Sequence, residues 1–205
     1  RYFVQFTTDG VFYSTDVTSV SVLIHTYFGQ FNADIILNKM EKGKKWGTPT
    51  HKYYGMNREE IKALWDANGK ASLEAGVSFH FLCECYSNGW RDLRSNDIYM
   101  ARPEVRQFLK YYKEEITAKG LIPFRTKIRF RSTIAEAVCG SADLLVVRAN
   151  HPLPEDCGGV LTLGIREWKN NKEIKYNNHF QKGKGICAEL DDCNYQHYAM
   201  QLSTY

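Results

Sequence analysis

An acid and a base stand two residues apart in the segment LTLGIREWKNNKEI, residues 161–174. The segment begins like a buried strand, and a strand alternates its side chains between two faces. Ile165, Glu167 and Lys169 should therefore share one face, with Trp168 on the other. The acid and the base are then either an ordinary surface ion pair or half of an active site.

A second carboxylate lies upstream, in CGSADLLVV. Asp143 precedes a run of Leu and Val, where a carboxylate is costly to bury without a cation or a metal as partner. Alone, such an Asp more often caps a turn and stays hydrated. With Glu167 and Lys169 on the next strand, it predicts two oxygen ligands for Mg²⁺ or Mn²⁺ beside one ammonium. Lys169 would orient a water or stabilise charge on a phosphate, and the backbone carbonyl of Trp168 would add a metal ligand.

Three motifs, in this order along the chain, resemble the PD-(D/E)XK nuclease superfamily, in particular its lambda-exonuclease and RecB-like branch: GSAD, REWK and QLSTY. By that resemblance Asp143 is the first acid, Glu167 the second acid and Lys169 the catalytic lysine. The resemblance implies a restriction-endonuclease-like core, which is an α/β (α+β) fold with a central mixed β-sheet flanked by helices. It implies a metal-dependent DNA nuclease, and it extends from about Thr18 to Tyr205, where the chain is similar to nuclease domains of large DNA viruses and some eukaryotes.

Two helical motifs add residues to the site that the resemblance implies. Gln201 and Tyr205 are four residues apart, hence on one helix face, and match the Q-x-x-x-Y helix of the branch. They would contact the DNA backbone or support the metal-bound water. Gly76, His80 and Glu84 form a G-x-x-x-H-x-x-x-E pattern that resembles the helix in which RecB-like nucleases supply a histidine to the metal. A histidine packed between phenylalanines is the alternative interpretation of His80.

One position departs from the family pattern. Lys127, in RTKIRF, stands where relatives often carry another acid, so a third carboxylate for a second metal would have to come from Glu84 or Glu136. This departure is the basis of an alternative function, a nucleic-acid-binding domain that keeps the fold but has lost hydrolysis. Another alternative is an interaction domain that holds zinc through its cysteines, which the absence of any C-x-x-C pair disfavours.

Basic residues predict where DNA would bind. Phosphate contacts need Lys, Arg and backbone N–H groups near the metal. The segments that follow the REWK motif supply such lysines, interleaved with Tyr176 and Phe180, which could stack on unpaired bases. These lysines are Lys172, Lys175, Lys182 and Lys184, and a solvated loop explains them equally well. Arg125 alternates with Arg129 and Arg131 along a predicted strand, where they line the same groove or form the solvated face of an edge strand.

Capping residues and periodicity predict the elements that carry these residues. A hairpin is expected in residues 1–13 with its turn at Asp9 and Gly10, and a helix after a cap at Thr18 or Ser19. Asn57 begins a capping box, whereas Gly76 argues against one unbroken helix from 58 to 86. The remaining predictions are helices at 32–45, at 102–120 with Pro103 in the first turn and Gly120 as the stop, and at 191–205 with Asp191 or Asp192 as cap, and strands at 122–132, 135–149 and 159–169.

The length and composition limit the domain organisation and the cellular location of the protein. The chain has 205 residues, 43% of them hydrophobic, a formal net charge of +4 and six cysteines. It should form a single nuclease domain, with a helical part at about 17–120 and a catalytic core of strands and a helix at about 121–205. No signal peptide or stretch of about 18 apolar residues is visible, which predicts a soluble protein of the cytoplasm or nucleus whose partner is DNA. The sequence does not predict an oligomeric state. Because a functional helix rarely stops at its last motif residue, Tyr205, we expect the native chain to continue.

Overall fold

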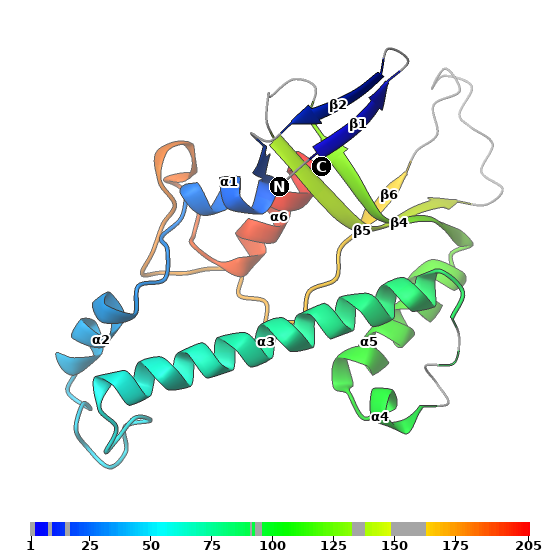
Figure 1. Ribbon diagram of the computed structural model, residues 1–205. Helices are drawn as coiled ribbons and strands as arrows, with labels where there is room; N and C mark the ends of the chain where they lie inside the picture. The colour runs from blue at the N-terminus through cyan, green and yellow to red at the C-terminus, as the bar shows by residue number, and fades with distance from the viewer. Residues whose placement is uncertain are drawn as a thin grey trace. The chain divides into compact units, whose positions relative to one another are not determined.

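The computed structural model describes residues 3–7, 10–14, 17–90, 92, 96–132, 138–148 and 163–205 (Figure 1). These residues form two compact units. The first unit contains residues 1–29 and 79–205, and the second contains residues 30–78. The described chain is mixed α/β, with a four-stranded mixed sheet flanked by helices in the first unit. No helix within the described ranges is long and apolar enough to cross a membrane.

The sheet of the first unit is built around β5 (Val138–Arg148). Strand β4 (Leu121–Arg131) and strand β6 (Gly164–Arg166) pair with β5 antiparallel, and the short β3 (Thr18–Ser19) pairs with it in parallel. Leu144 is paired with Arg166, so the register brings residue 167 next to residue 143 just past the end of β6. The sheet topology therefore places the two acidic motifs side by side.

A separate hairpin precedes this sheet. Strands β1 (Phe3–Thr7) and β2 (Gly10–Ser14) pair antiparallel, as the alternation of residues 1–13 predicts. Of the two predicted turn residues, Asp9 lies outside the described residues, and Gly10 is not in the turn but begins β2, paired with Thr7.

The larger hydrophobic core packs helices on β5. It joins the C-terminal end of α3 (Arg58–Ser87), α5 (Pro103–Tyr111) and the π-helical segment η2 (Tyr112–Thr117) to Leu144, Val146 and Trp168. The Trp168 ring lies edge-on to Phe108 and Tyr111, with centroids 5.1 and 5.7 Å away. Burial of this indole anchors the segment that follows β6 and so fixes Glu167 and Lys169 on either side of it.

A smaller core joins α1 (Val20–Thr26) to α6 (Asn194–Thr204), which lie side by side in Figure 1. Val20, Ile24 and Phe28 pack there with Cys187, which lies in the short 3₁₀ segment η4 (Gly185–Cys187). Ser19 caps α1 by accepting the Val22 N–H, as predicted. This core holds the face of α6 that carries the Gln/Tyr motif.

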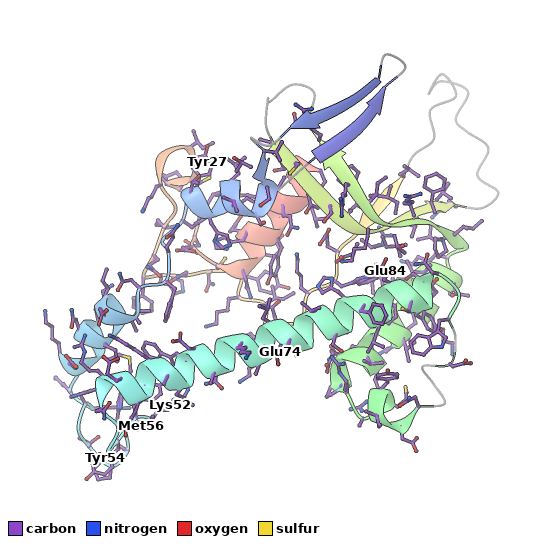
Figure 2. All side chains as sticks on the ribbon, viewed as in Figure 1. Tyr27, Lys52, Tyr54, Met56, Glu74 and Glu84 are labelled. Atoms are coloured by element: carbon purple, nitrogen blue, oxygen red, sulfur yellow. The ribbon has the colours of Figure 1, made fainter. Side chains whose placement is uncertain are left out.

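The second unit is helical. Asn57 and Glu60 form the predicted capping box, with N–H to side-chain oxygen distances of 2.7 and 2.9 Å, at the start of α3. Arg58 then binds Asp34 and Glu41 of α2 (Ala33–Glu41), a helix that begins at the predicted cap Asn32. Figure 2 shows Lys52, Tyr54 and Met56 in the turns that precede α3.

The structure corrects three predicted boundaries. Helix α3 runs unbroken through Gly76, because one glycine costs only about 1 kcal/mol and 30 residues of helix outweigh it. Helix α6 begins after Cys193 with no side-chain cap, since Asp191 accepts from Lys182 and the Asn178 N–H instead, and Asp192 from the Gly29 N–H.

The third boundary concerns the strand predicted at 159–169. Strand β6 ends at Arg166, so Glu167 and Lys169 lie beyond the strand and not within it. The beginning of that predicted strand, together with Glu136 and Cys157, lies outside the described residues.

The short helix α4 (Asp97–Met100), capped by Asn96, leads into α5, whose first residue is Pro103 as predicted.

Candidate functional site

One cavity of about 620 Å³ in the first unit collects most of the predicted site residues. Its walls come from α1 and β3, from α3, from β4 and β5, from the segment after β6, and from α6. Most of the side chains that line the cavity are charged or polar, among them His80, Lys127, Arg129, Ser141, Asp143, Glu167, Lys169, Gln201 and Tyr205. Residues from five separate chain segments thus meet at one place.

Asp143 lies at the base of this cavity with 5% of its side chain exposed. Its Oδ2 accepts the Trp168 N–H at 2.8 Å, and its Oδ1 contacts His80 Nδ1 at 3.0 Å and the Lys127 ammonium. Burial alone would raise the pKa of this carboxyl. The hydrogen bonds from His80, Lys127 and the Trp168 N–H outweigh burial and hold the pKa of Asp143 at about 2. Asp143 is therefore a fixed negative charge.

Glu167 is the second buried acid, with 7% of its side chain exposed. Its Oε1 accepts the Asp143 N–H at 3.3 Å, and its Oε2 lies 3.3 Å from Lys169 Nζ. Burial and the neighbouring Asp143 carboxylate raise the pKa of Glu167 above its usual value, against the opposing effect of Lys169. Two adjacent buried carboxylates favour a cation between them.

A chain of side-chain hydrogen bonds continues from the lysine to α6. Lys169 Nζ donates to Gln201 Oε1 at 2.8 Å, and Gln201 Nε2 donates to the Tyr205 hydroxyl at 2.6 Å. The same ammonium lies 4.9 Å from the centre of the Tyr198 ring. Both polar ends of the Gln201 amide are therefore used, the oxygen by Lys169 and the nitrogen by Tyr205. Gln201 and Tyr205 lie one helical turn apart, as their spacing predicts.

Tyr205 is held by the sheet as well as by Gln201. Its ring packs on Phe130, with centroids 5.5 Å apart, and covers the Cα of Gly140 on β5. Burial raises the pKa of the Tyr205 hydroxyl, which therefore stays protonated at neutral pH. Gly140 of the GSAD motif thus has a role that the sequence did not suggest, because its lack of a side chain leaves room for the Tyr205 ring.

Lys127 and Arg129 line the cavity from β4. The resemblance pointed to position 127 as the place of a further acid, but the sequence did not predict that a lysine there would contact Asp143. The alternation of Arg129 with Arg125 and Arg131 predicted either the lining of a groove or the solvated face of an edge strand. The signal that could have found both is the register of β4 against β5, which pairs Arg129 with Ser141 and Ile128 with Ala142.

The residues predicted to follow the DNA backbone lie elsewhere. The predicted set consists of Lys172, Lys175, Lys182, Lys184 and Arg125, all of them exposed, and no member of this set lines the cavity. Lys182 is engaged in an ion pair with Asp191, with Nζ and Oδ1 2.6 Å apart. The positive charge that faces the two acids comes from Lys127, Arg129 and Lys169.

The donor set suits a hard divalent cation. Mg²⁺ is usually held by one or two carboxylates together with water and substrate oxygens, and Asp143 and Glu167 supply two. Among the described residues, no three His, Cys, Asp or Glu side chains converge as metal ligands. His80 instead contacts Asp143 Oδ1, and the Asp143 backbone N–H donates to Glu167 Oε1. The ammonium of Lys127 lies against both His80 and Asp143. Comparison of the chain with family models, curated proteins and solved structures finds no match.

Proposed function

We propose that this protein is a metal-dependent nuclease that hydrolyses phosphodiester bonds in DNA, with a restriction-endonuclease-like core. The observation that carries the proposal is the continuous set of contacts from Asp143 through Glu167, Lys169 and Gln201 to Tyr205 in one cavity. The resemblance in the motifs predicts these five residues together. A buried acid pair joined to an oriented ammonium is costly to maintain without a function, because each group loses hydration.

Asp143, Glu167, His80 and the carbonyl of Trp168 are the groups that would hold Mg²⁺ or Mn²⁺. The bound cation would supply a Lewis acid that lowers the pKa of a water molecule and offsets charge on the phosphate. Asp143 is suited to this role because its pKa of about 2 keeps the carboxyl ionised at neutral pH. The raised pKa of Glu167 is what a bound cation would bring down, since the cation favours the ionised form.

Lys169 provides the fixed positive charge of the proposed reaction. Its ammonium is held between Glu167 Oε2 and Gln201 Oε1, so it is oriented before substrate arrives. A preorganised cation of this kind stabilises charge that develops on a phosphate without needing to reorient. Gln201 positions Lys169, and Tyr205 in turn positions Gln201.

The charge of the cavity favours DNA as the partner. Arg129 of β4 lines the same wall as Lys127 and offers a guanidinium for a bidentate phosphate contact. The exposed Lys172, Lys175, Lys184 and Arg125 do not line the cavity and would extend the phosphate contacts of a longer DNA substrate.

A second candidate function rests on Lys127. Its ammonium neutralises Asp143, which would be expected in a domain that binds nucleic acid through this fold without hydrolysing it. The two candidates differ in whether cleavage accompanies binding.

The deciding experiment incubates the purified protein with linear DNA, circular DNA and RNA in the presence of Mg²⁺, Mn²⁺ or EDTA. Lys169→Ala and Asp143→Asn should each lower cleavage on the order of 10²-fold or more, while the exposed Lys110→Ala on α5 is the matched lysine control. Cleavage of linear DNA alone would assign an exonuclease. Tight binding of DNA without cleavage under any metal would overturn the nuclease and support the second candidate.

A further inference from the structure

Lys127 has an unusual backbone conformation. Its φ is +48°, and it is the only non-glycine residue with positive φ in the described part of the chain. A side chain in this left-handed region costs on the order of 1 kcal/mol, and such residues cluster at functional sites. The conformation lies within β4, between Thr126 and Ile128, both of which keep their ladder partners on β5. The sheet therefore holds Lys127 in this conformation from both sides.

The side chain ends on the two groups that would bind the metal. Lys127 Nζ contacts Asp143 Oδ1 and lies 3.3 Å from His80 Nδ1. The other oxygen of Asp143 is taken by the Trp168 N–H. Oδ1 is thus the oxygen of Asp143 that is left for a metal in the cavity, and the Lys127 ammonium lies against this oxygen.

The contact differs from an ordinary surface ion pair in two ways. Asp143 is almost fully buried, whereas 38% of the Lys127 side chain is exposed, so the ammonium approaches the acid from solvent. His80 also cannot satisfy both neighbours. If Nδ1 carries a hydrogen, it donates to Asp143, but this hydrogen also faces the hydrogens of the Lys127 ammonium. If Nδ1 carries no hydrogen, it accepts from Lys127, but its lone pair faces the Asp143 carboxylate.

From this geometry we infer that Lys127 is a tethered cation that competes with the divalent metal for Asp143 and His80, so that metal binds only when the ammonium is displaced from Asp143 Oδ1. The inference rests on the proposed function. Displacement frees Asp143 Oδ1 for the metal and removes the ammonium from His80 Nδ1. The ammonium then remains in the cavity with Arg129, where a phosphate would receive it. Lys127 thereby sets the affinity of the site for metal, and couples metal binding to the arrival of an anionic substrate.

The test measures metal affinity directly and without DNA. The Kd for Mn²⁺ is obtained from the loss of the free-ion EPR signal and from calorimetry, for the unaltered protein, Lys127→Met and Lys127→Gly. Methionine keeps the length of the side chain without its charge, and glycine suits the positive φ, so at least one neutral variant should fold. Lys127→Arg keeps a positive charge, and Lys110→Met is the control for loss of an exposed lysine.

Coulomb repulsion between an ammonium and a divalent cation about 4 Å apart, even at the dielectric constant of water, corresponds to a change in Kd on the order of thirtyfold. Because the partly exposed Lys127 can move away, we expect the neutral variants to bind Mn²⁺ about tenfold more tightly. The two control variants should keep the Kd of the unaltered protein. In the absence of metal, both neutral variants should melt at lower temperature because Asp143 loses its cation, and Mn²⁺ should restore the melting temperature more in them than in the unaltered protein.

Each outcome separates this inference from the nuclease. Tighter Mn²⁺ binding in both neutral variants supports the inference even if no variant cuts DNA. Equal Kd values in all variants overturn it, even if metal-dependent cleavage is found. Absence of Mn²⁺ binding at millimolar concentration in every variant overturns the inference, and the cleavage assay then decides the metal-dependent nuclease separately.

Discussion

Replacement of Gly140 by alanine should break the contact between β5 and the Gln/Tyr helix. An ideal Cβ on Gly140 would lie 3.0 Å from Cδ1 and 3.3 Å from Cζ of the Tyr205 ring, and closer still to Cε1. The aromatic ring is rigid and already packs on Phe130, so it must move as a body. Overpacking of this kind typically costs about 1–3 kcal/mol, which for a chain of this size lowers Tm by about 2–12 °C.

The matched control is Gly76→Ala in α3. No atom lies within 4 Å of a Cβ added at Gly76, and alanine is the better helix former by about 1 kcal/mol. The same chemical change should therefore stabilise the protein at Gly76 and destabilise it at Gly140. Thermal unfolding followed by circular dichroism measures both.

A double-mutant cycle tests the stated cause. In a Tyr205→Ala background the ring is gone, and Gly140→Ala should be nearly neutral, which gives a coupling free energy of about 1–3 kcal/mol. If Gly140→Ala costs the same with and without the Tyr205 ring, the overlap is not the cause and the packing described for this face is refuted. If the nuclease proposal also holds, Gly140→Ala should lower cleavage, because displacement of Tyr205 releases Gln201 and Lys169.

Three further changes have calculable outcomes. Asn57→Ala should cost about 0.5–2 kcal/mol by removing the capping box at the start of α3, measured by urea denaturation against Thr50→Ala as a surface control. Trp168→Ala should cost about 3–5 kcal/mol because it empties the ring position between Phe108 and Tyr111, and a smaller loss would contradict the core described for the first unit. Burial lowers the pKa of His197 in the folded state, so the unfolded chain binds the proton first as pH falls below about 6.5 and stability is lost in that direction. His197→Gln should flatten the fall of Tm between pH 7.5 and pH 5, and an unchanged slope would show that another group is responsible.

The local signals in the sequence were reliable because they depend on neighbouring residues. Ser19 and Asn57 cap helices where their types and spacing predict, and Pro103 begins α5. The wrong predictions arose because these signals ignore contacts with residues distant in the sequence. Asp191 is a good helix cap in isolation, but its ion pair with Lys182 and its bond to the Asn178 N–H, contacts across a loop, outweigh the gain from capping α6. Local propensity decides an element only where tertiary contacts do not compete for the same group.

The motif residues of the site could be predicted as a set because strand pairing and helical spacing bring them together. The register of β5 and β6 makes Asp143 and Glu167 neighbours, and the four-residue spacing links Gln201 to Tyr205. Their catalytic roles stay a prediction. The lysines after the REWK motif show the limit, because none of them lines the cavity although they are near it in the chain, and their phosphate contacts stay a prediction.

The contact of Lys127 with Asp143 could not be predicted from the sequence, for a physical reason that bears on how the site works. In a regular strand its neighbours Thr126 and Ile128 would share a face opposite to it, and nothing in the letters RTKIRF marks a left-handed residue between them. The conformation exists because the ladder fixes both neighbours while the buried Asp143 draws the ammonium, and the strength of that attraction depends on Asp143 lacking another cation. A divalent ion at Asp143 removes the attraction that compensates the backbone cost, so binding of metal should itself favour release of Lys127 and not merely tolerate it. The expected signature is a change in the amide NMR signals of residues 126–128 on titration with Mg²⁺, and signals that stay fixed while metal binds would show that the ammonium and the metal occupy different places.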